Sequence, residues 1–439
     1  MLTGFLRAFR TPDLRRKLLF TIFIIAVFRL GAALPIPGIS EKAVSRCVGL
    51  ANSHGGSVYQ LVNLFSGGAL LKLSVFALGI MPYITANIIL QLLAVVIPRL
   101  ETLRQEGQAG QNKITQYTRY LTVGLAVLQS TGIIALARSG RLYQGLQCTN
   151  SGQLIPHPSI FTITTMVICM SAGTAVIMWL GELITDRGIG NGMSLLIFTT
   201  VISQIPGYMV NIYKARHGFV FTVVLAIGIA VIAFIVFMEQ AQRRIPVQYA
   251  KRMIGRKMYG GTSTYIPLKV NQAGVIPVIF GSSLLYIPQL AGSLFGNQRH
   301  PQGWYRWVLT YLITGSSPIY MASFFVLTIF FTYFYVAITF NPTEVADNMK
   351  KYGGFIPGIR PGRPTAEYLN YVLTRITAPG SLYLGLIALI PMIAFALLGV
   401  SQNFPFGGTS ILIMVGVGLD TVKQIESQLQ QRNYEGFLR

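Results

Sequence analysis

Long windows of apolar residues with few or no charges recur along this whole chain. A window of about 18 residues is enough to cross a hydrocarbon core about 30 Å thick as a helix, which rises 1.5 Å per residue. Only 11% of the residues are charged and 52% are hydrophobic, whereas soluble domains average about 25% charged residues. The sequence therefore predicts a helical membrane protein with several spans and excludes an ordinary soluble protein.

Ten such windows can be drawn as spanning helices. The eighth and ninth are longer than one crossing needs, so we expect them to tilt or to project beyond the bilayer. An even number of spans puts both termini on the same side of the membrane. The ten predicted spans cover approximately residues 18–35, 75–97, 117–137, 158–181, 191–210, 218–239, 272–293, 307–338, 370–398 and 408–425.

The basic residues are divided unequally between the two faces. The chain has 35 Lys and Arg against 13 Asp and Glu, a net charge of +22. With the ten spans drawn as above, the face that carries the termini holds 25 of the basic residues and the opposite face holds 9. Positive residues concentrate on the cytoplasmic side, so we predict that both termini are cytoplasmic. The same basic loops favour contact with acidic lipid, ribosomal RNA or an acidic soluble partner.

Three segments between the spans are longer than a simple connection needs. The predicted cytoplasmic loops 240–271 and 339–369 are basic and contain Gly and Pro, which indicates shaped protrusions. In the second loop, two Pro-Gly pairs form a stiff turn that holds Arg360 at a fixed position, although the sequence alone favours a solvated loop tip. The external segment 35–74 includes Ser57–Phe65, which is too short to span and could form a short re-entrant or surface helix.

A few side chains inside the predicted spans need an explanation. Arg29 is a basic residue well inside an apolar run. Such a cation either marks a functional site, or it only reaches toward a helix end or pairs with a carbonyl group, and the sequence does not choose between these. Ile80 and Ile84 are four residues apart on one helical face, which by default is a packing stripe. Polar residues follow them in the same span and indicate that this helix borders a cavity.

The motifs of catalysis and cofactor binding are missing from the sequence. The segment 188–192 is rich in glycine, but no strand precedes it and no Gly-Lys-Ser/Thr follows, so we interpret it as a loop that opens the fifth helix. Cys47, Cys148 and Cys169 have no metal-ligand spacing; Cys169 is expected to pack as a small apolar residue, and the other two are predicted external residues that could form a disulfide. We therefore predict no catalytic residues, metal or cofactor.

A secondary transporter of small solutes is the main alternative among membrane proteins. It would require carboxylates within the membrane or a site for a coupling ion. The ten predicted spans contain few acidic residues beyond Asp420, which lies near a helix end. The sequence therefore favours a channel over a transporter.

Several stretches, taken together and in order, resemble the SecY family, and the resemblance covers essentially the whole chain. Among them are Pro35-Ile-Pro-Gly38, Asn63-Leu-Phe-Ser-Gly-Gly-Ala-Leu70, Arg187-Gly-Ile-Gly-Asn-Gly192, Phe355-Ile-Pro-Gly-Ile-Arg-Pro-Gly362 and Phe406-Gly-Gly-Thr-Ser410. The resemblance implies an all-α integral membrane fold with ten transmembrane helices around an hourglass pore, a plug and a lateral gate. The helices would form two pseudosymmetric halves of five: residues 1–210, with the plug at about 57–68, and residues 211–439, with both large cytoplasmic loops.

The function implied by this resemblance is that of a protein-conducting channel subunit. Such a subunit translocates unfolded preproteins across the bacterial cytoplasmic membrane and inserts membrane proteins into it, driven by the SecA ATPase or the ribosome. The implied partners are SecE, SecG, SecA, the ribosome, signal peptides, unfolded preproteins and anionic lipids. A plastid thylakoid membrane is a second location compatible with the family, although the long match favours the bacterial plasma membrane.

The resemblance also assigns site residues. A ring of pliable apolar side chains can close around a passing chain without binding it and can exclude ions by dewetting; Met193 departs from the aliphatic residue usual in this ring but is equally pliable. The implied pore ring is Ile80, Ile84, Met193, Ile197, Ile279 and Ile413; the plug includes Ser57, Val58, Leu61, Val62, Leu64 and Phe65; the lateral gate includes Thr85, Asn87, Gln91, Ser282 and Ser283; and the docking surface for SecA and the ribosome includes Arg243, Arg244, Lys251, Arg252, Arg256, Lys257 and Arg360.

Overall fold

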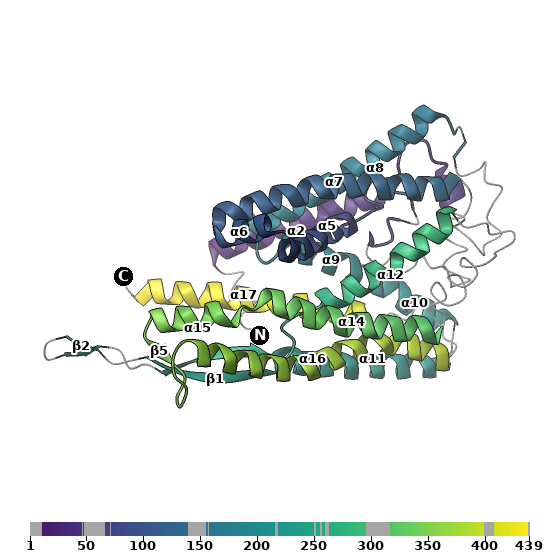
Figure 1. Ribbon diagram of the computed structural model, residues 1–439. Helices are drawn as coiled ribbons and strands as arrows, with labels where there is room; N and C mark the ends of the chain where they lie inside the picture. The colour runs from purple at the N-terminus through teal and green to yellow at the C-terminus, as the bar shows by residue number, and fades with distance from the viewer. Residues whose placement is uncertain are drawn as a thin grey trace.

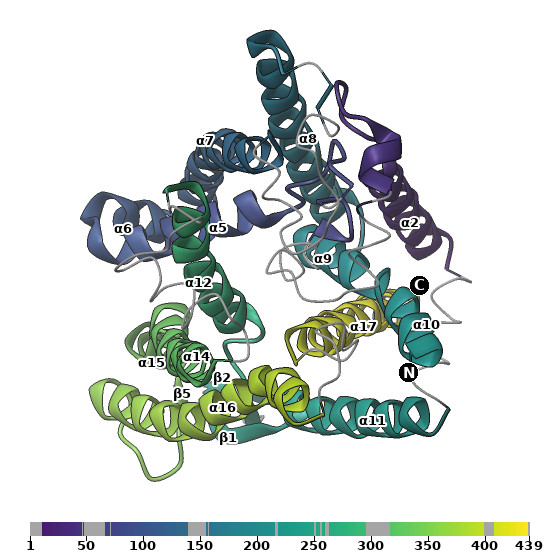
Figure 2. The ribbon, with the colours of Figure 1, turned by 90° about the vertical axis from the view of Figure 1, so that its right-hand side faces the viewer.

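The computed structural model is predominantly helical, and each of the ten predicted spans overlaps a helix in the part of the chain that it describes. Figure 1 shows two layers of helices, with α2 and α5–α8 in one, α11 and α14–α17 in the other, and α9 and α12 between them. Viewed end-on, the helices surround a central region (Figure 2). The structure describes residues 11–45, 47, 66–70, 72–138, 155–156, 158–215, 218–249, 252–254, 257–259, 263–295, 317–398 and 408–437.

The helices differ widely in length, from 8 residues in α6 to 36 in α16. In the first part they are α2 (Pro12–Ala33), α5 (Met81–Val96), α6 (Pro98–Gln105), α7 (Gln108–Arg138), α8 (Ile160–Arg187), α9 (Gly192–Ile202) and α10 (Ile205–Ala215). In the second part they are α11 (Gly218–Gln240), α12 (Ile276–Phe295), α14 (Pro318–Thr339), α15 (Pro342–Lys351), α16 (Arg363–Leu398) and α17 (Gly408–Phe437).

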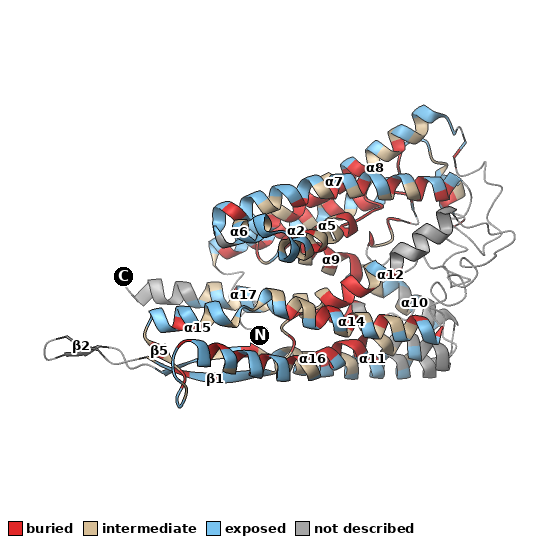
Figure 3. Cartoon of the chain, in the orientation of Figure 1, coloured by how far each residue is buried: buried red, intermediate tan, exposed pale blue. Residues whose placement is uncertain are grey.

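The outer surface of the helical layers is apolar, as a bilayer requires. Phe23, Phe237 and Val326 are large hydrophobic side chains that the fold leaves exposed. Buried positions gather where helices meet, while exposed positions follow the outer faces of α7 and α8 (Figure 3). Within the described residues, five helices are long and apolar enough to cross a membrane, and the pair α5–α6, bent by 105°, adds a sixth candidate. The count of ten spans remains a prediction.

Two predicted spans differ from the helices observed. The second was expected from residue 75, but α5 begins at Met81, and the residues before it form turns in which Gly79 has a φ of +57°. Pro82 explains this start, because proline fits the first turn of a helix, where its missing N–H is not needed. The fifth predicted span is divided into α9 and α10, and Pro206 likewise stands in the first turn of the second piece.

The first large loop, 240–271, folds as an antiparallel sheet that the sequence analysis did not predict. Strand β1 (Gln242–Tyr249) pairs with β4 (Ser263–Lys269), in a register from Gln242 opposite Lys269 to Gln248 opposite Ser263. Two short strands, β2 (Arg252–Ile254) and β3 (Lys257–Tyr259), pair within the same loop. The other edge of β1 pairs with β5 (Gly354–Phe355), which belongs to the second large loop.

This sheet packs against the helices of the second loop. Side chains alternate along β1, so that Ile245 and Val247 are buried while their neighbours face outward. They form one apolar cluster with Met349 of α15 and with Leu369 and Val372 of α16. The two large loops are therefore one folded platform at one end of the helical layers (Figure 1).

Candidate functional site

The six residues of the predicted pore ring come together in the structure. They reach the same place from four segments that are far apart in sequence: α5 with Ile80, the residue that directly precedes it, α9, α12 and α17. Five of the six are buried in a single apolar cluster, and the sixth, Ile84, packs against it. The buried members are Ile80, Met193, Ile197, Ile279 and Ile413.

The glycine-rich segment 188–192 positions the ring residues of α9. Asn191 caps this helix, since its Oδ1 accepts hydrogen bonds from the backbone N–H groups of Met193 (3.1 Å) and Ser194 (3.3 Å). A Cβ atom added to Gly192 would lie 1.8 Å from the carbonyl oxygen of Gly181, so α8 and α9 touch through their backbones. The glycines thus serve helix capping and close packing, in agreement with the interpretation of this segment as a helix-opening loop.

A cavity of about 590 Å³ opens against the ring. Five ring residues line it, all but Ile80, so the apolar cluster forms part of the cavity wall. The remaining lining is largely polar and comes from α5, α7, α8, α11 and α17. An apolar cluster beside a polar cavity is the combination of surfaces that dewetting of a pore would require.

The cavity has the opposite charge to the protein as a whole. Among the described residues that line it are four carboxylates, Glu182, Asp186, Glu239 and Asp420, against one cation, Arg119. In a chain with a net charge of +22, this lining is acidic. Carboxylates around an aqueous passage raise the local concentration of cations.

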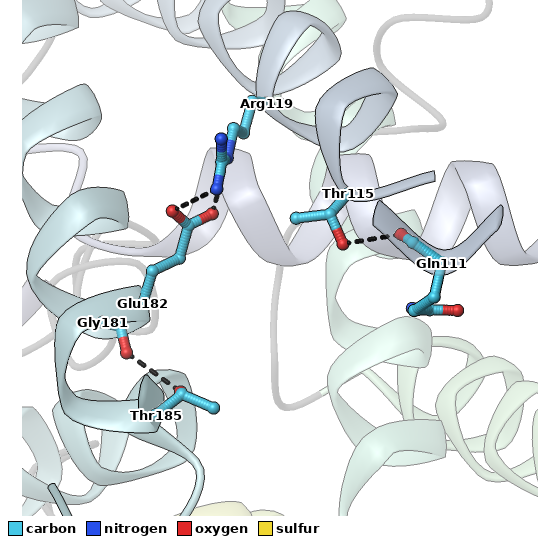
Figure 4. Close-up of polar contacts among 6 residues, drawn as sticks. All are labelled: Gln111, Thr115, Arg119, Gly181, Glu182 and Thr185. Carbon is cyan, nitrogen blue, oxygen red and sulfur yellow. Dashed lines mark hydrogen bonds and ion pairs between the residues drawn. The ribbon is translucent and has the colours of Figure 1, made fainter. Parts of the chain in front are cut away.

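Three of these carboxylates have described partners. Arg119 of α7 binds Glu182 of α8 through two hydrogen bonds of 2.8 Å each, which Figure 4 shows as a two-pronged contact between the helices. Glu239, near the end of α11, accepts a hydrogen bond from the Asn271 side chain, and Asp420 lies 3.6 Å from the Lys269 ammonium group. These contacts join α7 to α8 and connect α11 and α17 to residues of the platform loop 240–271.

Four of the five residues predicted for the lateral gate line one of two cavities. Asn87 and Gln91 line the acidic cavity. Thr85 and Ser283 line a smaller, mostly apolar cavity of about 180 Å³ between α5, α7, α12 and α14. Ser282 bonds to the carbonyl oxygen of Ile279 within its own helix. Helices α5 and α12 therefore face each other, but the five polar side chains do not form one cluster.

The predicted plug lies mostly outside the described residues, which resume at Ser66. The turn at the end of the predicted plug contains Gly67 and Gly68, with φ values of +65° and +88°. Arg29 of α2 is half-buried and donates a hydrogen bond from Nη1 to the carbonyl oxygen of Gly67 at 3.4 Å. Of the two interpretations left open by the sequence, the contact with a carbonyl group is therefore observed.

The predicted docking residues lie on the platform where the structure describes them. Arg243 and Arg244 are exposed on β1, and the Arg244 guanidinium lies 4.8 Å from the centre of the Tyr265 ring. Arg252 and Lys257 belong to β2 and β3, whereas Lys251 and Arg256 lie outside the described residues.

Arg360 is exposed on the turn between β5 and α16. Gly358 and Gly362, on either side of it, have φ values of +84° and +103°, and its carbonyl oxygen accepts a hydrogen bond from Thr365 Oγ1 at 2.9 Å. The turn therefore has a defined shape, as the two Pro-Gly pairs predicted.

Sequence reasoning missed the acidic character of the cavity. Glu182 and Glu239 each lie next to a boundary of a predicted span, and charged residues at such boundaries are usually assigned to the membrane surface. Only Asp420 was singled out. Cys47, one of two candidates for a disulfide, is disulfide-bonded, Cys169 is a free thiol, and Cys148 lies outside the described residues.

Comparison with known proteins gives consistent matches. A family model described as SecY matches residues 74–422. Over the full length of both chains, the protein is 67% identical to the protein translocase subunit SecY of Streptomyces galbus and 61% identical to that of Mycobacterium tuberculosis.

Solved structures match the fold at much lower sequence identity. One, described as the structure of a protein conducting channel, has a TM-score of 0.63 at 18% identity and covers 94% of this chain and 91% of that chain. Sec61 in the canine ribosome-channel complex from the endoplasmic reticulum has a TM-score of 0.59 at 16% identity, with the same two coverages.

Proposed function

The chain belongs to the SecY family, and we propose that it is the channel subunit that moves unfolded preproteins across a bacterial cytoplasmic membrane and inserts membrane proteins into it. The observation that carries this proposal is the apolar ring cluster, five of whose predicted ring residues line a polar cavity. Close relatives over the full length carry the name of a protein translocase subunit, which supports the same function.

The ring explains how one pore can accept many sequences. Isoleucine and methionine side chains have no polar atoms that could hold a passing chain, and they repack around side chains of different shape. When no chain is present, the same side chains close on one another and exclude water. The ring therefore acts as a passive seal, and the family acts as a channel and not as a catalytic enzyme.

The energy for transport comes, on this proposal, from partners that dock on the platform: the SecA ATPase or the ribosome. Both large basic loops belong to the platform, and Arg360 stands on a turn of defined shape. SecE and SecG are the proposed membrane partners, and purification from native membranes should recover two small membrane proteins with the chain. Their absence would argue against assembly as a SecY complex.

The orientation in the membrane follows from the positive charges. We propose that both termini and the platform face the cytoplasm, because 25 basic residues lie on that face and 9 on the other when the ten predicted spans are drawn. The anionic lipids of that leaflet would attract the same residues. Protease cleavage of the platform from the cytoplasmic side only would support this orientation.

The Arg360→Glu substitution tests docking. It reverses a charge on an exposed turn, so the protein should fold normally, while ATP-driven preprotein translocation into reconstituted vesicles should fall at least tenfold. Arg363→Glu is the matched control, because Arg363 is also exposed and its only described ion pair is with Glu367, four residues away. Normal translocation by the Arg360→Glu protein, or an equal loss in both variants, would contradict a specific docking role for Arg360.

A further inference from the structure

Arg29 is a cation held inside the apolar part of the first predicted span. Its guanidinium donates a hydrogen bond to the carbonyl oxygen of Gly67, and in the described part of the chain no carboxylate lies within ion-pair distance of it. The neighbouring Phe28 belongs to the apolar cluster that contains the ring. A charged side chain in such surroundings is costly unless carbonyl groups or water satisfy its donors.

The turn that Arg29 contacts is closely packed. A Cβ atom added to Gly67 would lie 3.0 Å from Arg29 Nη1 and 3.3 Å from Thr200 Cβ, so the turn lies between α2 and α9. Ser66 Oγ accepts a hydrogen bond from the backbone N–H of Leu70 at 3.1 Å, which closes the turn on itself. Ala69, at the end of the turn, is 0% exposed and belongs to the ring cluster.

The turn that Arg29 contacts lies close to the ring. Thr200 lies three residues after the ring residue Ile197 on the same helix, so the turn 66–69 is packed directly beside the ring. If the turn moved away from α9, the guanidinium would lose the carbonyl group that it binds. Its donors would then need water or another acceptor in place of that carbonyl group, so the contact is lost when the turn leaves α9.

We propose that Arg29 is a positioning residue that holds the turn 66–69 against α9 and so stabilises the closed ring. The inference rests on the proposed channel function, because a closed ring has a purpose only in a channel. It gives a role in the closed state to a cation whose contact with Gly67 could otherwise serve only to stabilise the fold. The contact favours the closed state because the carbonyl partner is available only while the turn is in place.

Accessibility of residue 69 tests this role directly. In a purified full-length protein carrying Cys169→Ala and Ala69→Cys, the new thiol should react slowly with a membrane-impermeant maleimide, because Ala69 is 0% exposed. Adding Arg29→Met keeps much of the side-chain length but removes the charge, and should raise the labelling rate at least tenfold. Arg29→Lys retains the cation and should give an intermediate rate.

Arg16→Met is the matched control, because Arg16 lies on the same helix but is exposed. It should leave the labelling rate unchanged. A folded Arg29→Met protein with the rate of the parent would overturn the inference; if Arg29→Met does not fold, a folded Arg29→Lys protein with the parent rate would do the same. A purely structural role would lower thermal stability without changing the rate.

The labelling rate is independent of transport, so the two proposals fail in different ways. Unchanged labelling with intact preprotein translocation would overturn the role of Arg29 alone. A parent protein that translocates no preprotein would overturn the proposed function whatever the labelling rate. Ion leak through vesicles containing Arg29→Met, without the cysteine substitutions, is a second measurement and should rise with the labelling rate.

Discussion

Truncation of one ring residue, Ile279→Ala, should open the resting pore by an amount that can be worked out from its burial. Ile279 is 6% exposed and packs within the ring cluster. Removing a buried isoleucine side chain to alanine costs about 2 to 5 kcal/mol in a packed site. In an open ring the same side chain faces water or the passing chain, so its removal costs little there. The free energy of opening should therefore fall by about 2 kcal/mol, which corresponds to a roughly 30-fold increase in the open population.

The measurement is ion flux from vesicles that contain the purified protein without substrate. The flux through Ile279→Ala should rise roughly 30-fold over the wild type, unless the pore is already open for much of the time. Ile235→Ala is the matched control. Ile235 is 0% exposed, lies on α11 and belongs to a different apolar cluster, so its truncation should reduce stability comparably and leave the flux unchanged.

Two results would refute this reasoning. A wild-type flux through Ile279→Ala would mean that Ile279 does not contribute to the seal. An equal rise in both variants would mean that any loosening of the helices causes leak, and that the ring has no special part in it.

Three further predictions follow from the cavity and the α8–α9 connection. The leak through Ile279→Ala should be cation-selective because of the acidic lining, and adding Glu239→Gln and Asp420→Asn should move its reversal potential in a salt gradient toward zero. Asn191→Ala removes the cap of α9 and should lower the unfolding free energy by about 1 kcal/mol, measured by thermal denaturation in detergent. Asn191→Ser keeps a side-chain oxygen that can cap the helix, so it should keep most of the wild-type stability. Gly192→Ala should cost about 1 to 3 kcal/mol because α8 and α9 must separate, whereas Gly124→Ala, which meets nothing within 4 Å, should be neutral or slightly stabilising.

The membrane spans could be predicted because hydropathy acts over many residues at once, but the ends of the helices could not. Prolines at positions 82 and 206 decide where α5 and α10 begin, and a hydropathy window averages over them. The platform was recognised as two shaped loops and not as a sheet. Its strand β5 has two residues and pairs with β1 more than a hundred positions earlier, so no local pattern could reveal it.

The ring was assigned by resemblance to a family, because spacing alone gives only a stripe such as Ile80 and Ile84. Four helices converge on one place only in the tertiary structure. The Arg119–Glu182 pair joins residues 63 positions apart, and in the sequence Arg119 lies at the start of the third predicted span while Glu182 directly follows the end of the fourth. Such pairs depend on how two helices rotate against each other, which the composition of either helix does not determine.

The platform sheet has a mechanical consequence. Its long hairpin runs from the last residues of α11 almost to the first of α12, and its base is closed by the hydrogen bond from the Val270 N–H to the Ala241 carbonyl oxygen at 3.0 Å. The seven paired positions of β1 and β4 make an arm roughly 20 Å long, at about 3.3 Å per residue. A partner that pushes on the tip of the hairpin would therefore apply a turning force to α11 and α12 together, and α12 carries Ile279. The hairpin therefore connects the platform, through α12, to one residue of the proposed seal.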